Sequence, residues 1–473
     1  MKNLFKIILI NLIIIPLFSC ASVQSYQASG TETQMTNALL RDDLRQVKAL
    51  LAEAASPNSR MPTSGMYVLT IPLQNNNLEM AKLLIDAGAD VNMKDRDGMP
   101  LLHLAKKAPM IRLMLEHGAD MYAVCNNATA YDFFATRLVT TDKDKKYFIS
   151  LLKAQKLPQN VYQYAVKNAE KNDWITSQDI IDTVIVYKDF NYDVNRQFGE
   201  EKQSLLHCAA RAENYDFLSA VITRTDANVN IRDRWDVSIL NIITQSDTTK
   251  RTAAEYEQLL SIMMKKGLQI DAVSGINGDE KATALMIASQ KNYFSRCAAL
   301  VKAGANPKIV NENHKAAINF ARDLRVVKFL IDNGADPLNK DKWQQTAIFY
   351  QKDTAVIGLL LAGGVKINDQ DKDGNTALFC VHDPKAVEYL IAKGMDINHL
   401  NKRKQSTIEV DVANIHEAMR FDKDLQDEYI PKFRILIKHG MNKTLITNAC
   451  EMAKKSSLNM EKVVAFLKPY ASL

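Results

Sequence analysis

The residue types that could carry catalysis or hold a metal are scattered along this chain. Its eight histidines form no His-Glu-x-x-His motif, and the chain has no glycine-rich phosphate loop. Five cysteines beyond the first twenty residues stand far apart, with no Cys-x-x-Cys pair: Cys125, Cys208, Cys297, Cys380 and Cys450. That spacing fits neither a zinc site nor a redox motif. We therefore expect buried, unpaired thiols that act as small hydrophobic residues.

Other catalytic patterns are equally hard to find. No serine stands in the Gly-x-Ser-x-Gly context of a nucleophile elbow. Acidic residues are numerous, but they concentrate in Asp-rich turns, where carboxylates are usually solvated. The segment GINGDEK at 275–281 is rich in oxygen donors but lacks the spacing of a calcium loop. The sequence therefore predicts a protein that is not an enzyme and has no catalytic residues, metal, cofactor or small-molecule substrate.

One cysteine does have a defined chemical role. Residues 1–19 begin with a basic segment that holds two lysines, and an apolar run follows at Ile7–Ile15. The run is too short for a comfortable membrane span and has the layout of a secretory signal peptide. It ends in Leu-Phe-Ser followed by Cys20, which resembles the lipobox of bacterial lipoproteins. The alternative is an ordinary signal peptide followed by a chance cysteine.

The lipobox resemblance implies a modification and a location. In that family the cysteine receives a diacylglyceryl thioether, the signal peptide is cut before it, and the new amine is acylated. Several acyl chains on one residue anchor far more firmly than one, at about 0.8 kcal/mol per buried CH₂ group. Ala21 follows Cys20, whereas in enteric bacteria Asp at that position signals retention in the inner membrane. We expect a protein of the bacterial cell envelope, lipid-anchored in the outer membrane, with a short tether at 20–32.

The remainder of the chain consists of repeats. One phrase recurs as LLIDAGADVN at 83–92 and as FLIDNGADPL at 329–338, and a second, such as TAIFYQ at 346–351, precedes it. The glycine of the first phrase recurs at Gly88, Gly118, Gly304, Gly334, Gly364 and Gly394, and the last four are each 30 residues apart. Periods of this length are typical of a solenoid.

Each repeat predicts two helices and a turn. A hydroxyl residue stands where the first helix should begin, and we expect it to cap free backbone N–H groups, at Ser204, Ser238, Thr283, Thr346 and Thr376. The second helix carries apolar residues at three- and four-residue spacing, for one buried face. The recurring glycine should end it in the left-handed conformation. Asp-rich segments such as QDKDG at 370–374 favour a tight hairpin turn.

The two phrases resemble the ankyrin repeat, whose signature is Thr-Pro-Leu-His, a helix of small residues, and a Leu-rich helix that ends in Gly-Ala-Asp. The resemblance implies an all-α repeat solenoid of about 12–13 ankyrin repeats, with helix-turn-helix units joined by short hairpin loops. His103 and His207 fall on the signature histidine, which braces neighbouring hairpins in that family. The 30-residue interval is three short of the family's 33, so the first helix or its turn should be shorter.

The repeats are not uniform along the array, which we expect to cover 33–473. Loop insertions at 137–147 and 245–257 interrupt degenerate repeats. We divide the array into degenerate repeats around 120–275, regular repeats at 276–400 and C-terminal capping repeats at 401–473. Terminal repeats of a solenoid are expected to be atypical because one side faces water.

Two of the three tryptophans fall at expected hairpin tips. Trp235 and Trp343 occupy the position that aspartate fills in other units, and basic residues, including Arg234 and Lys342, flank them. Interface hot spots favour Trp, Tyr and Arg, so these four residues are candidates for partner binding. Such basic residues would favour an acidic protein surface or an anionic polymer. Alternatively, each tryptophan lies flat over the neighbouring hairpin as a packing residue.

The formal net charge of +6 is too small to argue for nucleic acid. The sequence predicts a membrane-anchored, exported scaffold or adaptor that binds a protein partner through its concave or hairpin face. One alternative is an immunity- or inhibitor-type protein that neutralises a toxin or hydrolase in the envelope. Another is a structural spacer. Ankyrin folds bind many unrelated proteins, so the fold does not identify the partner.

Overall fold

The computed structural model describes residues 30–62, 64–95, 98–125, 128–132, 177–246, 251–275, 280–421 and 423–471. These residues belong to two compact units, of which the first ends at Arg234 and the second begins at Trp235. The expected signal peptide, Cys20, most of the tether and the insertion at 137–147 lie outside the described residues. Part of the insertion at 245–257 does so as well.

The first unit is built from short helices in pairs and one small hairpin. The pairs are α2 (Gly30–Leu40) with α3 (Leu44–Ala52), α4 (Thr70–Gln74) with α5 (Leu78–Asp86), the 3₁₀ helix η1 (Leu101–Leu104) with α6 (Ala108–Glu116), and α11 (Leu205–Arg211) with α12 (Tyr215–Arg224); α10 (Ser177–Asp189) lies between the last two pairs in sequence. Strands β1 (Val124–Cys125) and β2 (Ala128–Thr129) pair antiparallel.

The second unit continues the same pattern. Its pairs are α13 (Ile239–Gln245) with α14 (Ala253–Lys265), α15 (Ala284–Gln290) with α16 (Phe294–Lys302), α17 (Ala317–Phe320) with α18 (Leu324–Asp332), η2 (Ala347–Tyr350) with α19 (Thr354–Ala362), η3 (Ala377–Phe379) with α20 (Pro384–Ala392), α21 (Thr407–Met419) with α22 (Gln426–Lys438), and α23 (Lys443–Lys455) with α24 (Glu461–Leu467), followed by η4 (Lys468–Tyr470).

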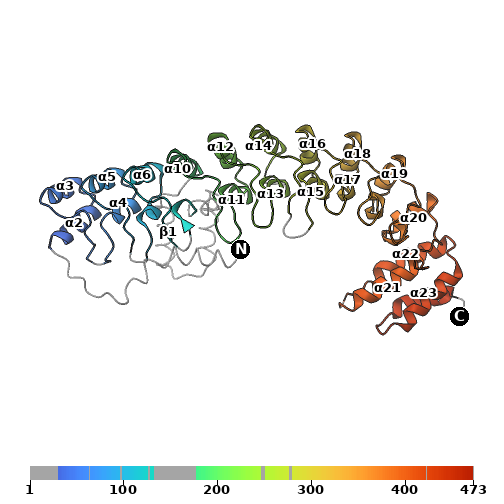
Figure 1. Cartoon of the computed structure of the whole chain (residues 1–473). Helices are drawn as coiled ribbons and strands as arrows, with labels where there is room; N and C mark the ends of the chain where they lie inside the picture. Colours follow the sequence, from blue (N-terminus) through green and yellow to red (C-terminus); the bar gives the residue numbers. More distant parts are fainter. Residues whose placement is uncertain are drawn as a thin grey trace. The chain divides into compact units, whose positions relative to one another are not determined.

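Within each unit the helices form two rows, as Figure 1 shows for the second helices α14, α16 and α18 above the first helices α13, α15 and α17. The core lies between the rows. In α18, for example, Val326, Val327 and Leu330 are fully buried, and the equivalent Val356, Ile357 and Leu360 of α19 are buried too. This arrangement confirms the all-α repeat solenoid.

The 30-residue interval shortens the first helix of the pair. The first helices α11, α13 and α15 each have seven residues, whereas α17 has four and its equivalents η1, η2 and η3 are single 3₁₀ turns. A 3₁₀ turn advances farther per residue than an α-helix and suits short pieces. The second helices α18, α19 and α20 each keep nine residues. The row of second helices, which we call the outer row, is therefore preserved.

This shortening makes two of the expected helix caps wrong. Ser238 and Thr283 do accept hydrogen bonds from Asn241 N and Met286 N, as expected. The hydroxyls of Thr346 and Thr376, however, are buried without a hydrogen-bond partner. In these 3₁₀ turns the third amide donates to the threonine carbonyl instead, as Phe349 N does to Thr346 O. Ser204 forms a capping box with His207, whose ring nitrogen Nδ1 accepts from Ser204 N at 3.1 Å and lies 2.8 Å from the Ser204 hydroxyl.

The recurring glycine ends the second helix as predicted. Gly334 has φ +93° and Gly394 has φ +94°, a conformation that residues with a Cβ atom rarely adopt. The amide after each glycine closes the helix, since Ala335 N donates to Leu330 O and Met395 N donates to Leu390 O. The left-handed cap therefore turns the chain sharply out of the second helix and towards the next hairpin.

Two cationic side chains are buried in the core of the second unit. Lys432 on α22 is fully buried and forms an ion pair with the fully buried Asp411 of α21, at 2.8 Å. Arg296 on α16 is 2% exposed and donates to the carbonyl oxygens of Thr244 and Ser246. Burying a charge is costly unless it is paired or hydrogen-bonded, and both side chains have such partners.

Among the described residues, no helix combines the length and the apolar character that crossing a membrane requires.

Candidate functional site

The tips of the hairpins line one side of the second unit. Each tip follows a buried Asp or Asn, at Asn311, Asp341, Asp371 and Asn401. The side-chain oxygen of this residue accepts two backbone amides ahead of it. Asp341 Oδ1, for example, accepts from Trp343 N at 2.9 Å and from Gln345 N at 3.0 Å. These side chains satisfy the turn locally, which is why Asp and Asn are favoured there.

Backbone hydrogen bonds join each tip to the next. Lys342 N donates to Asn313 O at 2.9 Å, Lys372 N to Trp343 O at 2.8 Å, and Lys402 N to Asp373 O at 3.0 Å. We call the tips at Glu312–Asn313, Lys342–Trp343, Lys372–Asp373 and Lys402–Arg403, together with Trp235–Asp236, the hairpin edge. These backbone bonds link the four tips from Glu312–Asn313 to Lys402–Arg403, which therefore present their side chains on a fixed frame.

Trp235 is the most exposed aromatic residue of the hairpin edge, with 51% of its surface accessible. The backbone next to Trp235 is held by the segment that contains Gly275, because Gly275 N donates to Asp236 O at 2.8 Å. A Cβ atom on Gly275 would lie 2.2 Å from Trp235 O. Glycine is therefore required at 275 for this close approach, and the contact fixes the backbone from which Trp235 projects.

Trp343 is more enclosed than Trp235. The ammonium group of Lys342 lies 4.5 Å from the centre of its ring, and that of Lys315 lies 5.2 Å away. Lys315 also approaches the rings of Phe320 and Tyr350, at 5.5 and 5.6 Å. A cation this close to aromatic faces is attracted by their quadrupoles. Part of the Trp343 ring thus packs against the protein's own lysines.

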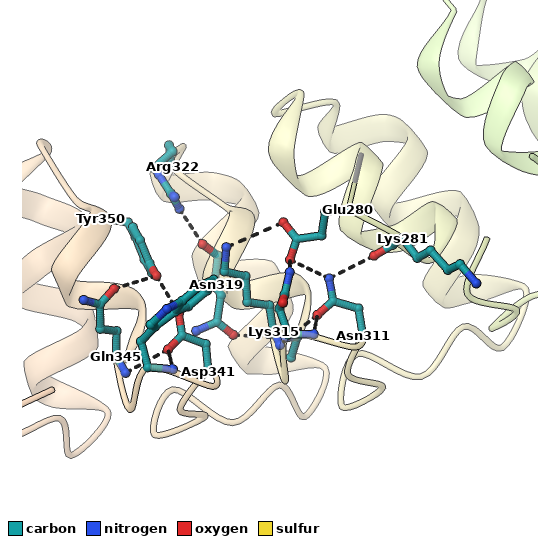
Figure 2. A network of polar contacts seen from close by, with 12 residues as sticks. Glu280, Lys281, Asn311, Lys315, Asn319, Arg322, Asp341, Gln345 and Tyr350 are labelled. Carbon is teal, nitrogen blue, oxygen red and sulfur yellow. Dashed lines mark hydrogen bonds and ion pairs between the residues drawn. The ribbon is translucent and has the colours of Figure 1, made fainter. Parts of the chain in front are cut away.

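A polar network lies beneath this part of the hairpin edge (Figure 2). Glu280 accepts from the side-chain amides of Asn311 and Asn313, at 2.8 and 2.7 Å, and pairs with Lys315 at 3.6 Å. Partial burial works to raise the pKa of Glu280, but the two amide hydrogen bonds and the charge of Lys315 outweigh it and leave the pKa below its usual value. Glu280 therefore stays ionised and holds Lys315 in place.

Tyr350 extends the network to the next repeat. Its hydroxyl lies 2.5 Å from Asp341 Oδ2 and 2.7 Å from Gln345 Oε1, and Gln345 Nε2 donates to Asp371 Oδ2 at 3.0 Å. Burial and the Asp341 carboxylate raise the pKa of Tyr350. The Arg322 guanidinium stands over the Tyr350 ring at 5.2 Å. These contacts rigidify the frame under Trp343.

The four residues expected to bind a partner fall in different settings. Trp235, Trp343 and Lys342 all belong to the hairpin edge of the second unit, and the side chain of Lys342 is exposed. Arg234 is the last residue of the first unit, where it is exposed and its backbone amide donates to Glu201 O at 2.8 Å. Trp235, Lys342 and Trp343 therefore lie on the hairpin edge of the second unit, whereas Arg234 belongs to the first unit.

Sequence reasoning missed the residues that support the tips. Lys315, Tyr350 and Gly275 were not singled out, although all three determine how the tryptophans are held. The repeat alignment holds one weak signal for Lys315. It places Lys315 where the following repeats have Gln345, Asn375 and Gln405, so it replaces an uncharged residue with a cation.

The five cysteines are free thiols, as expected, but only Cys297 and Cys450 are buried; Cys125 and Cys208 are partly exposed and Cys380 is exposed. Burial raises the pKa of Cys208 to about 12 and that of Cys297 to about 11. The pKa of Cys380 also rises to about 11, through desolvation of its sulfur and the nearby Asp371 carboxylate. Such thiols carry little of the thiolate that a nucleophile needs.

No cluster of three or more His, Cys, Asp or Glu side chains within the described part of the chain could hold a metal ion. His103 and His207 are both buried, at 4% and 0% exposure. The geometry of the hairpin edge instead offers a row of aromatic and cationic side chains on a rigid backbone. That combination suits the binding of another macromolecule.

Comparison with known proteins identifies the repeat type. Residues 35–125 and 313–401 match the family of ankyrin repeats (3 copies). A protein of Treponema pallidum (strain Nichols) that is named as ankyrin repeat-containing is 29% identical over 116 residues, which cover 24% of this chain and 39% of that protein. Each of the two units thus contains residues that match ankyrin repeats, and the described part of the chain is an all-α repeat solenoid.

Proposed function

We propose that this chain is a scaffold of a bacterial cell envelope that is exported, anchored through lipid on Cys20, and binds a protein partner at the hairpin edge. Ankyrin repeats commonly mediate protein–protein binding. The observation that carries the proposal is the hairpin edge itself. It presents the half-exposed Trp235, whose backbone is held by Gly275, and a row of lysines on tips that are joined by backbone hydrogen bonds.

Trp235 is the side chain best placed to act as an anchor. Its backbone is fixed by Gly275 and its side chain is half exposed, so its surface can be buried without reorganising the tip. Trp343 contributes less new surface because it is only partly exposed; two lysines lie over its ring. We infer that Trp235 forms the aromatic centre of the interface and that Trp343 mainly supports the basic part of the hairpin edge.

The Trp235→Ala variant should bind the partner at least tenfold more weakly, since truncating a tryptophan hot spot costs about 2 kcal/mol or more. Its circular dichroism spectrum should be unchanged, because the side chain is half exposed. The measurement is quantitative pull-down from an envelope extract. Phe294→Ala is the matched control, since Phe294 is 37% exposed on α16, in the outer row. Equal loss of capture by both variants would contradict the assignment of Trp235.

The anchor has its own test. Cells that express the chain should incorporate an alkyne-labelled fatty acid into it, and Cys20→Ala should abolish that label, because the thioether requires the thiol. The label is read by in-gel fluorescence, and fractionation should move the variant out of the membrane pellet. Equal labelling of the variant and the natural chain would exclude Cys20 as the lipid attachment site.

A further inference from the structure

The last three tips of the hairpin edge are rich in positive charge. Three successive tips expose a lysine at the same position, 30 residues apart: Lys342, Lys372 and Lys402. Lys340, Arg403 and Lys404 are exposed on the same hairpins, whereas Asp373 is the exposed acidic residue at these tips. The other two carboxylates in the turns, Asp341 and Asp371, are buried and accept hydrogen bonds within the protein.

These cations differ from lysines of the second helices in what they contact. On the second helices, Lys302 pairs with Glu257, Lys328 with Asp332, and Lys438 with Glu388, at 2.8–3.2 Å. In the described part of the chain, none of Lys342, Lys372 and Lys402 pairs with a carboxylate. Lys402 Nζ instead donates to the carbonyl oxygen of Lys372, and Lys342 lies over the Trp343 ring.

Apolar side chains accompany the cations. Leu338 and Leu400, which precede two of these tips, are 47% and 40% exposed, and Trp343 lies between them in sequence. Regularly spaced cations, with exposed apolar side chains on the same hairpins, match an extended acidic polypeptide that also carries apolar residues. A phosphate polymer or a lipid headgroup would use the cations but leave the apolar surface in water.

We propose that the tips at 340–344, 370–374 and 400–404 bind an acidic segment of a partner protein. Its carboxylates pair with Lys342, Lys372 and Lys402, and its apolar side chains cover Leu338, Trp343 and Leu400. This inference rests on the proposed function in placing the partner at the hairpin edge, and it adds the chemistry of that partner. Complementary charge should speed association and select the partner more than it tightens binding.

The test uses the full chain, purified in detergent, and a fluorescein-labelled peptide of repeated Glu-Glu-Leu units, with a Lys-Lys-Leu peptide for comparison. Fluorescence anisotropy should show binding of the acidic peptide only. The triple variant Lys342→Glu, Lys372→Glu and Lys402→Glu should bind it at least tenfold more weakly. Raising the salt from 0.1 M to 1 M should also weaken binding, because the screening length falls from about 10 Å to about 3 Å.

The matched control reverses three exposed lysines away from the tips, Lys291, Lys352 and Lys385, none of which pairs with a carboxylate in the described part of the chain. Its net charge equals that of the triple variant, and its binding should stay within twofold of the natural chain. Equal weakening of both variants would overturn the proposal, as would absence of peptide binding combined with binding to phosphatidylglycerol vesicles.

The outcome is separable from that of the proposed function. If a partner is captured at Trp235 in cells and the triple variant captures it as well as the natural chain does, the acidic-segment proposal fails and the scaffold stands. If neither the natural chain nor the triple variant captures a partner, the proposal that the chain is a scaffold fails.

Discussion

Lys432→Met is expected to destabilise the C-terminal part of the second unit by about 3–5 kcal/mol, the usual cost of removing one partner of a buried ion pair. Lys432 and Asp411 are both fully buried, and their charged atoms are 2.8 Å apart. Methionine keeps most of the side-chain volume, so the loss measures the charge rather than a cavity. The Asp411 carboxylate would keep its contact with His382, whose Nε2 lies 3.1 Å from Oδ1.

A second contact increases the effect. Lys432 Nζ donates to Leu378 O at 2.5 Å, and this carbonyl belongs to the single turn η3. Thr407 Oγ1 donates to the same oxygen at 3.0 Å. Lys432 thus ties η3, α21 and α22 together. Loss of the ammonium would remove the ion pair and weaken the link between neighbouring repeats.

Repeat arrays can unfold in parts, so the measurement must be local. Hydrogen exchange of α21 and α22 amides, followed by mass spectrometry, reports the free energy of their opening, and urea denaturation gives the midpoint for the chain. The control is the double variant Lys432→Met with Asp411→Leu, which should recover most of the lost stability because no unpaired charge remains. A single variant within 1 kcal/mol of the natural chain would show that the pair contributes little.

Arg296→Met is expected to cost about 2–4 kcal/mol, because it removes the guanidinium that donates to one buried and one partly buried carbonyl group. Arg296 Nη1 lies 2.6 Å from both Thr244 O and Ser246 O, and Nη2 lies 3.4 Å from Ser246 Oγ. The guanidinium also stands over the Tyr256 and Tyr293 rings, at 5.2 and 4.9 Å. One side chain on α16 therefore fixes the end of α13.

Lysine cannot replace this arginine. The variant Arg296→Lys keeps the charge but loses the planar fork that reaches several acceptors and stacks on rings, so it should recover less than half of the lost stability. Hydrogen exchange in α13 should rise in both variants, and more in Arg296→Met. Unchanged exchange in α13 would show that the end of this helix is held by other contacts.

Much of the fold could be predicted because its determinants are local. The recurring glycine ends second helices such as α18 and α20 through its own conformation, and a buried Asp such as Asp341 forms its turn with amides two and four residues ahead. The failed caps at Thr346 and Thr376 show the limit. Whether a hydroxyl caps a helix depends on whether the next turn is α-helical or 3₁₀. The 30-residue interval between glycines did not show which part of the repeat was shortened.

The hairpin edge was predictable in position but not in detail. Alignment of the repeats placed Trp235 and Trp343 at tips, and both are found there. Their different exposure depends on residues distant in sequence. Lys315 lies over the ring of Trp343 and also approaches the ring of Tyr350, whereas Gly275 contacts the backbone of Trp235. Such contacts arise from the stacking of repeats, and a single repeat contains no information about them.

The most direct test of the account is site-specific photocrosslinking in living cells. A benzophenone amino acid replaces Trp235 in one strain and Lys385, which is exposed on α20, in another. We predict a discrete crosslinked protein from position 235 and none from 385, with the crosslink reduced when Lys342, Lys372 and Lys402 are changed to glutamate. No crosslinked protein from position 235, or the same products from both positions, would contradict a binding surface at the hairpin edge.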